Sequence, residues 1–163
     1  MYKYELKNIN LSQMKQLATN LAKVFVAGDV VALNGDLGAG KSTLARFIIQ
    51  SFLGDETNVP SPTFTLVQTY EAKKFDIWHM DLYRLEEPTQ IIELGVEEAF
   101  SSSLCLIEWA EKGQGFLPRE IMNINIENGD CLNSRNIVFL GDKFKQKKLD
   151  KLINGDEKNE KNK

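Results

Sequence analysis

One stretch decides the fold of this chain: Gly35-Asp36-Leu37-Gly38-Ala39-Gly40-Lys41-Ser42-Thr43. An apolar run, 30–33, precedes it, and a helical pattern, 44–49, follows it. Glycine, four residues and then Gly-Lys-Ser is the phosphate-binding loop, and the strand–loop–helix context that this motif requires is present. The stretch therefore predicts a nucleotide-binding α/β domain.

The spacing of this loop follows from the chemistry of phosphate binding. Gly38 and Gly40 can adopt backbone angles closed to other residues, so that successive N–H groups surround an anion. The helix that begins near Lys41 adds the positive end of its dipole. Lys41 can reach the β- and γ-phosphates, and the Ser42 hydroxyl can ligate Mg²⁺. The predicted ligands are thus ATP, or a related triphosphate, and Mg²⁺.

Bulk composition limits the other classes of function. A chain of 163 residues is expected to form one domain with a sizeable core. A net charge of −3 argues against a general nucleic-acid surface. Only Cys105 and Cys131 are present, each beside apolar residues, and we expect both to be buried reduced thiols. No run approaches transmembrane length, so we expect a cytoplasmic protein that does not contact a membrane.

Before and through the loop, the pattern predicts alternating strands and helices. We expect an edge strand over 2–6, a helix capped by Ser12 that runs to Gly28, a buried strand over 29–34, and a helix that ends at Gly54. This alternation predicts a central, largely parallel sheet with helices on both faces.

After the loop helix, two prolines make 54–62 a connecting loop. We expect an antiparallel hairpin from strands 63–70 and 75–82, then a short helix carrying Ile91, a doubly buried strand 104–107, and strands 121–126 and 136–140. The predicted ATPase domain spans 1–142. Residues 143–163 form a Lys-rich helix or tail, whose last residues we expect to be disordered.

A phosphate loop needs an acidic partner for Mg²⁺ at the end of a neighbouring buried strand. Glu108 ends the most apolar run after the loop strand, and ligands bind at that edge of open parallel sheets. Asp81, within a second strand-like segment, is the other candidate. Each could instead be a solvated carboxylate at a strand end, which is the commoner fate of acidic residues.

Other polar residues have two interpretations each. Thr63, in Ser61-Pro62-Thr63, could sense the γ-phosphate with its hydroxyl, although Ser-Pro-Thr is also an ordinary turn. His79 is the only histidine, and a structural role is favoured over catalysis. Trp109, beside Glu108, could pack the site or present an aromatic ring to a partner, and core packing is the default. A basic patch could be a solvated tail or a contact for RNA or an acidic partner; it consists of Lys143, Lys145, Lys147, Lys148 and Lys151.

Four motifs together resemble the bacterial TsaE family: Gly-Asp-Leu-Gly-Ala-Gly-Lys-Ser-Thr (35–43), Ser-Pro-Thr-Phe (61–64), His-Met-Asp-Leu-Tyr-Arg (79–84) and Leu-Ile-Glu-Trp (106–109). Members of this family are small ATPases required for the threonylcarbamoyl modification of the adenosine next to the anticodon in tRNAs that read ANN codons. The resemblance implies that ATP hydrolysis acts on a partner complex of the TsaB/TsaD type, which transfers the group. Any contact with tRNA is then expected to go through that complex.

The resemblance also implies roles for individual residues. Lys41 is similar to the phosphate-binding lysine, Ser42 to the magnesium hydroxyl and Thr63 to the switch threonine. Asp81 resembles the aspartate that positions or activates the attacking water, and Glu108 the magnesium-side acid with Trp109 as its companion. Leu11 and Ser12 correspond to the border of the adenine, and Arg135 to a late arginine near the nucleotide. Met14 and Ala110 depart from the residues usual in relatives, threonine and proline.

Two alternative functions share the same loop. A small-molecule kinase needs a second pocket, usually with several arginines over the phosphates, and here Arg46, Arg84, Arg119 and Arg135 are scattered along the chain. A nucleotide-gated binding module, in which turnover is incidental, requires the same loop and switch. The residues alone barely separate that module from a slow ATPase.

Overall fold

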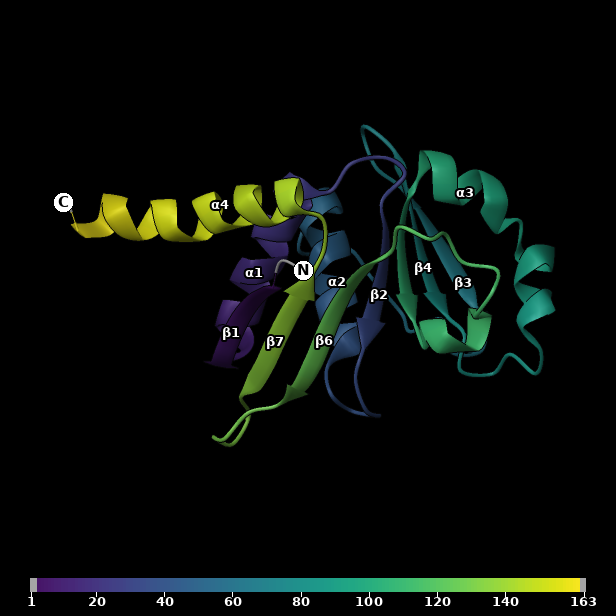
Figure 1. Cartoon of the computed structure of the whole chain (residues 1–163), viewed down its shortest axis with the longest axis horizontal. Coiled ribbons are helices and arrows are strands. Elements are labelled where there is room, and N and C mark those ends of the chain that lie inside the picture. Colours follow the sequence, from purple (N-terminus) through teal and green to yellow (C-terminus); the bar gives the residue numbers. More distant parts are fainter. Residues whose placement is uncertain (1–2, 162–163) are drawn as a thin grey trace.

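The computed structural model describes residues 3–161, and side-chain surroundings for residues 3–154. Its strands form one seven-stranded sheet in the order β1-β7-β6-β2-β5-β4-β3 (Figure 1). The strands are β1 (Lys3–Ile9), β2 (Val30–Asn34), β3 (Val67–Glu71), β4 (Asp76–Asp81), β5 (Leu104–Glu108), β6 (Met122–Asn128) and β7 (Arg135–Leu140). The helices are α1 (Leu11–Val24), α2 (Lys41–Leu53), α3 (Val96–Ser102) and α4 (Lys143–Lys161), with 3-10 helices η1 (Pro88–Leu94) and η2 (Ala110–Gly113).

The centre of the sheet is parallel. Strand β2 pairs with β5 on one side and β6 on the other, and β4 continues beside β5. The hairpin β3–β4 adds an antiparallel strand at one edge. This confirms the prediction of a largely parallel sheet with an added antiparallel hairpin. At the other edge β7 and β1 are also antiparallel, so β1 is an edge strand as expected, although Tyr2 lies outside the described residues.

Alternation along the central strands gives the sheet two buried faces. Val31 and Leu33 of β2 pack with the buried sides of α1 and α2. Val30 and Ala32, which alternate with these two along the strand, pack with α3, η1 and η2 on the opposite face. Every residue of β5 is buried, as expected of a strand covered on both sides. The prediction of helices on both faces is therefore confirmed.

Three local predictions are wrong for identifiable reasons. Helix α1 is capped by Asn10, whose side chain accepts from the Gln13 N–H while the Gln13 side chain accepts from the Asn10 N–H, so Ser12 lies inside the helix. The strand expected from Thr63 begins only at Val67, because Leu66 adopts a left-handed turn conformation at φ 66°. Cys131 is exposed in the β6–β7 connection, whereas Cys105 is buried in β5 as expected.

Helix α4 follows β7 and lies along α1 before it extends away from the body of the molecule (Figure 1). Leu149 is fully buried in the core of the α1 and α2 face, and Lys145 pairs with Asp29 at 3.1 Å. Of the end that we expected to be disordered, 159–163, residues 159–161 belong to α4, and residues 162 and 163 lie outside the described residues. Among the described helices, none is both long and apolar enough to cross a membrane.

Candidate nucleotide-binding site

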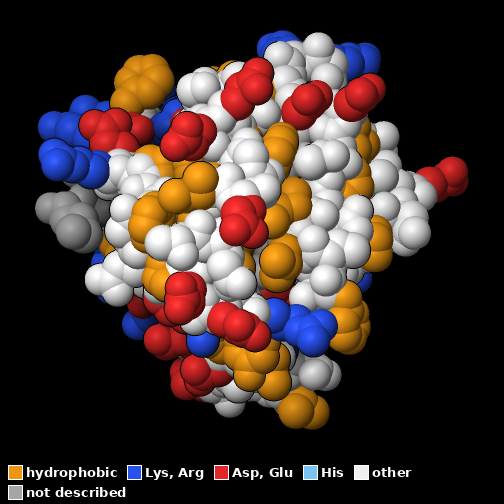
Figure 2. Space-filling model, turned by 90° about the vertical axis from the view of Figure 1, so that its right-hand side faces the viewer, with side chains coloured by type: hydrophobic (Ala, Val, Ile, Leu, Met, Phe, Trp, Pro, Cys, Tyr) orange, Lys and Arg blue, Asp and Glu red, His pale blue; other side chains and the backbone are white. Residues whose placement is uncertain are grey.

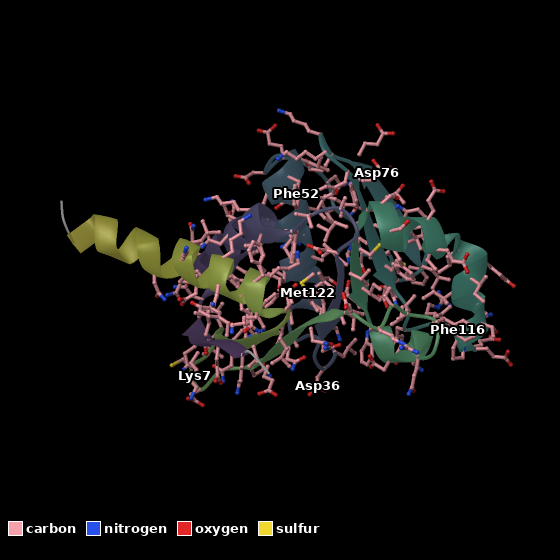
Figure 3. All side chains as sticks on the ribbon, turned by 45° about the horizontal axis from the view of Figure 1, so that its top comes forward. Lys7, Asp36, Phe52, Asp76, Phe116 and Met122 are labelled. Atoms are coloured by element: carbon pink, nitrogen blue, oxygen red, sulfur yellow. The ribbon has the colours of Figure 1, made fainter. Side chains whose placement is uncertain are left out.

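The phosphate loop connects the carboxyl end of β2 to the first residue of α2. Gly40 immediately precedes α2 at φ 115°, a conformation that favours glycine, and its carbonyl accepts the Leu44 N–H at 3.0 Å. Asp36 and Leu37 are exposed at the tip, whereas Ala39 is buried beneath it. Figure 3 shows Asp36 at the opposite end of the molecule from Phe52, near the end of α2. The amino end of α2 is therefore directed at the loop, as an anion site requires.

The register of β4 and β5 brings the two predicted acids together. Asp81 and Glu108 are direct partners in this parallel pair, at the carboxyl end of both strands. Residues that alternate along a strand share a face, so Asp81 lies on the side of Ile77, and Glu108 on the side of Leu106. Ile77 and Leu106 belong to the α1 and α2 core, so both carboxylates face α2 and the phosphate loop. Only 5% of Asp81 and 2% of Glu108 is exposed, so neither is a solvated carboxylate at a strand end.

Glu108 is held through both of its carboxylate oxygens. Ser42 Oγ donates to Oε1 at 2.8 Å, and His79 Nε2 lies 2.7 Å from Oε2. His79 is itself only 1% exposed. The predicted magnesium hydroxyl and the predicted magnesium acid are thus in direct contact.

Asp81 contacts the predicted switch. Thr63 Oγ1 donates to Asp81 Oδ2 at 3.1 Å, and the Tyr83 backbone N–H donates to Oδ1 at 3.0 Å. Ser61 Oγ lies 2.8 Å from the same threonine hydroxyl. The connection that carries Ser61 and Thr63 has no strand or helix between Leu53 and Val67. Asp81 therefore links the rigid sheet to an irregular segment.

Lys41 is folded back onto its own loop. Its Nζ donates to the carbonyl oxygens of Gly35 and Asp36 and lies 3.8 Å from the centre of the Trp109 ring. Trp109 has a left-handed backbone, φ 58°, which is uncommon for a bulky residue and costs about 1–3 kcal/mol. This conformation turns the indole toward Lys41 directly after Glu108. Trp109 therefore lies over Lys41, and it also packs against the core on the α3 face, as the default interpretation expected.

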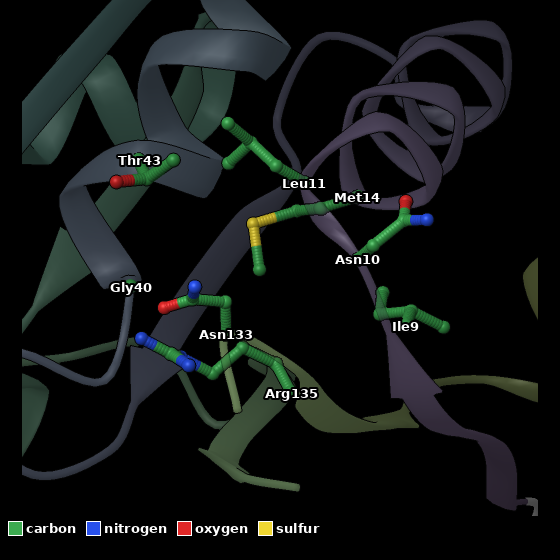
Figure 4. A pocket seen from close by; sticks show the side chains of 8 residues that line it. All are labelled: Ile9, Asn10, Leu11, Met14, Gly40, Thr43, Asn133 and Arg135. Atoms are coloured by element: carbon green, nitrogen blue, oxygen red, sulfur yellow. The ribbon is translucent and has the colours of Figure 1, made fainter. Parts of the chain in front are cut away.

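Beside the loop lies a largely apolar cavity of about 450 Å³, formed by segments far apart in the chain. Figure 4 shows the Met14 side chain at its centre, between Leu11 of α1 and Arg135 of β7. Arg135 Nε donates to the Ala39 carbonyl at 2.7 Å and so ties β7 to the phosphate loop. The complete lining is Ile9, Asn10, Leu11, Met14, Gly40, Thr43, Asn133 and Arg135.

The structure places some site residues that sequence reasoning missed. Asn10, Met14 and Asn133 line the cavity together with the predicted Leu11 and Arg135, whereas Ser12 is not among its lining residues. No local pattern could find Asn133, because its position depends on the pairing of β7. His79 was singled out with a structural role, and its place beside the site could have been found, because it stands two residues before Asp81 and so shares its face of the strand.

The donor set at the loop fits Mg²⁺. Ser42 and Glu108 provide a hydroxyl and a carboxylate, the hard oxygen ligands that Mg²⁺ prefers, and Mg²⁺ usually takes its remaining ligands from phosphates and water. Within the part of the chain that the structure describes, no three His, Cys, Asp or Glu side chains form a metal site of their own. A metal at this place would accordingly arrive with a phosphate ligand.

Comparisons with known proteins point to one family. The family model described as "Threonylcarbamoyl adenosine biosynthesis protein TsaE" matches residues 9–137. A protein of Rickettsia felis named "tRNA threonylcarbamoyladenosine biosynthesis protein TsaE" is 48% identical over 72% of this chain and 69% of its own. A protein of the same name from Bacillus subtilis is 37% identical over 82% of both chains. The crystal structure of Bacillus subtilis YdiB superposes with a TM-score of 0.73 and 30% identity, over 95% of this chain and 97% of that one.

Proposed function

The chain belongs to the TsaE family, and from this premise we propose that it is a Mg²⁺-dependent ATPase that serves the threonylcarbamoyladenosine modification of tRNA. The observation that carries the proposal is the contact of Ser42 Oγ with Glu108 Oε1 at 2.8 Å, at the start of the helix that the phosphate loop feeds. A structural turn rich in glycine has no need of a buried acid paired with its serine.

The triphosphate would lie against the backbone N–H groups of the loop and the start of α2. Ser42 and Glu108 would hold Mg²⁺, which when bound neutralises charge on the β- and γ-phosphates. Lys41 leaves the carbonyl groups of Gly35 and Asp36 and binds phosphate oxygens in their place.

Asp81 would orient the attacking water. It is buried, it lies beside Glu108, and one of its oxygens accepts from a hydroxyl on the irregular connection. When Thr63 turns toward a γ-phosphate, Asp81 Oδ2 becomes free to accept a hydrogen bond from water. An aspartate at hydrogen-bond distance can then position that water or take its proton.

The adenine would occupy the apolar cavity beside the loop. Met14 and Leu11 offer apolar surface, and the cavity adjoins Gly40 and Thr43, so a base there stays within reach of the phosphate site. Small-molecule sites are mostly apolar with a few polar groups that fix orientation, and the Asn10 and Asn133 amides supply such groups.

We further propose that the protein acts on a TsaB/TsaD-type complex and meets tRNA only through it. Figure 2 shows the side of the molecule formed around α3, where acidic side chains are spread over the surface. Glu93, Glu97 and Glu98 are exposed there. Such a surface repels the phosphates of a nucleic acid, which favours recruitment by protein over direct binding of tRNA at this side.

A kinase is the weaker alternative, because the arginines do not gather over the phosphate loop. Arg46 and Arg119 are exposed, and Arg84 lies over the Phe64 ring at 5.0 Å. Only Arg135 touches the loop, and it does so through a backbone carbonyl. A nucleotide-gated binding module shares every contact described above, so turnover must be measured to separate it from an ATPase.

The deciding experiment measures ATP hydrolysis by the purified protein, alone and with TsaB/TsaD-type partners. We expect slow hydrolysis that the partners stimulate and that Asp81→Ala abolishes. Asp76→Ala is the matched control, since Asp76 begins the same strand but is exposed and far from the loop. Hydrolysis that ignores the partners and requires a small phosphoryl acceptor would favour the kinase. ATP-dependent binding of the partners without turnover would favour the binding module.

A further inference from the structure

His79 is the single histidine of the chain, and it is buried against the presumed magnesium acid. Its Nε2 lies 2.7 Å from Glu108 Oε2, and the side chains are 1% and 3% exposed. Its other ring nitrogen, Nδ1, is buried without a hydrogen-bond partner. The two ring nitrogens therefore have very different surroundings.

These surroundings fix the tautomer. An ionised carboxylate only accepts hydrogen bonds, so the proton of a neutral imidazole must be on Nε2 for the contact with Glu108 to form. Nδ1 then carries only a lone pair, whereas a proton there would be a buried donor with no acceptor. The arrangement is that of a ring that donates to Glu108 through its Nε2–H.

We propose that His79 is the positioning residue of the magnesium site, an inference that rests on the proposed function. By holding Oε2, it directs Oε1 of Glu108 toward Ser42 and the phosphate loop. A glutamate side chain has several rotatable bonds, and ligating carboxylates are commonly oriented by a hydrogen bond of this kind. The side-chain hydrogen bond of His79 is made with Glu108, so His79 acts on the site through that residue.

The fold makes this contact more rigid than the one with Ser42. His79 and Glu108 lie on β4 and β5, which pair in continuous parallel register from Ile77–Leu104 to Asp81–Glu108. Ser42 is exposed at the start of α2 and must turn its hydroxyl to the metal when nucleotide binds. The hydrogen bond from His79 therefore remains when Ser42 changes its partner.

The test compares His79→Leu with His79→Gln. Leucine removes the donor, whereas the glutamine amide carries an N–H at the same distance along the side chain as Nε2. The affinity for a fluorescent ATP analogue is measured at increasing Mg²⁺ concentrations, and the affinity in EDTA gives the metal-free baseline. The readout is the Mg²⁺ concentration at which half of the total increase in affinity is reached. We expect His79→Leu to raise this concentration at least about 10-fold and His79→Gln to stay within about threefold of the wild type.

Ile77→Ala is the control for lost packing, because Ile77 is fully buried on the same face of β4, two residues before His79. It should lower the melting temperature and leave the Mg²⁺ response unchanged. The inference is overturned by an unchanged response in His79→Leu, by an equal defect in His79→Gln, or by an equal shift in Ile77→Ala. Wild-type binding that ignores Mg²⁺ would instead refute the proposed function, and the inference with it.

A second measurement needs no variant and stands even where His79→Leu does not fold. With ¹⁵N-labelled histidine, the protein gives a single imidazole in its spectrum, since His79 is the only one. We expect this ring to carry a proton on Nε2. A ring protonated at Nδ1 alone would show that His79 does not donate to Glu108 and would overturn the inference.

Discussion

Replacing Ser42 by alanine tests the proposed magnesium site at its exposed residue. Ser42 is exposed, and its Oγ donates to Glu108 Oε1 at 2.8 Å, whereas Glu108 is 2% exposed. The substitution removes one hydroxyl and leaves a buried carboxylate oxygen with one donor fewer. The backbone of the loop and Lys41 are unchanged.

The structure gives the magnitude of the loss in stability. A hydrogen bond to a charged group contributes about 1.5–3 kcal/mol, and the lower end applies because water can replace the exposed hydroxyl of Ser42. Alanine is the better helix former by about 0.5 kcal/mol, which leaves a net loss of about 1 kcal/mol. In a domain of this size that corresponds to a decrease of about 2–4 °C in melting temperature.

The functional effect should be much larger than the effect on stability. We expect Ser42→Ala to raise the Mg²⁺ concentration needed for tight ATP binding at least about 10-fold, with affinity in EDTA unchanged. Fluorescent-nucleotide titrations at graded Mg²⁺ measure this, and thermal melts measure the stability. Ser42→Thr keeps the hydroxyl and should retain the Mg²⁺ response. Ser51→Ala removes a comparable exposed hydroxyl, bonded to the Phe47 carbonyl at 2.7 Å on the same helix, and should have no effect on nucleotide binding. A folded Ser42→Ala protein with the Mg²⁺ response of the wild type would refute the assigned site.

Three further predictions follow from other contacts. Asp81→Asn should slow ATP hydrolysis about 100-fold while the affinity for ATP stays within about threefold, and a parallel loss of affinity would contradict a role in orienting water. Gly35→Ala would place a Cβ 2.6 Å from the Ile126 carbonyl oxygen, so the loop must shift. We expect urea unfolding to show a free energy of unfolding lower by about 1–3 kcal/mol. An unchanged free energy of unfolding would show that the loop can shift without cost. Burial raises the pKa of the Cys105 thiol to about 12, whereas in the unfolded chain the thiol ionises with a pKa of about 8.5. The contribution of this thiol to the free energy of unfolding is therefore fully present below about pH 8.5 and is lost as the pH rises toward 12. Between pH 8 and 10 the free energy of unfolding should fall by about 2 kcal/mol through this thiol, and Cys105→Ala should lack that decrease. An equal pH dependence of stability in both proteins would exclude ionisation of Cys105 as its cause.

Much of the fold could be predicted because its determinants are local. The loop motif fixed one strand and one helix, and the apolar run ending at Glu108 identified a strand covered on both faces. Local patterns failed where a single backbone angle or cap decided the outcome. Leu66 turns the chain out of the strand that its β-branched neighbours favoured, and Asn10 forms a reciprocal cap that Ser12 cannot.

The site was predictable to the extent that each residue could be assigned to the end of a strand. Placing Asp81 and Glu108 at the carboxyl edge required only the order of strands and the period of two. The cavity beside the loop was different, because Met14, Asn133 and Arg135 meet only after β7 has paired between β1 and β6. The side-chain partner of His79 likewise depended on which strand lies next to β4.

The pairing of β4 with β5 gives the two acids partners of different mobility. Glu108 is held by His79 from the neighbouring strand, whereas Asp81 is held in part by Thr63, on the connection without regular structure. A γ-phosphate that draws the Thr63 hydroxyl away would change the surroundings of Asp81 and leave the contact between His79 and Glu108 in place. Under the proposed function, Glu108 is therefore suited to hold the metal, and Asp81 to respond to the γ-phosphate.

Hydrogen exchange can test this division, because the two regions are separate in sequence. A non-hydrolysable ATP analogue with Mg²⁺ should slow amide exchange over 61–66, and ADP with Mg²⁺ should slow it much less, since only the γ-phosphate can engage the threonine hydroxyl. Exchange in β5 should already be slow without nucleotide and should not distinguish the two ligands, because this strand is buried throughout. In Thr63→Val the difference between the analogue and ADP should disappear. Equal protection of 61–66 by both nucleotides in the wild type would show that Thr63 does not sense the γ-phosphate. The hydrogen bond between Thr63 and Asp81 would then not be broken by the γ-phosphate.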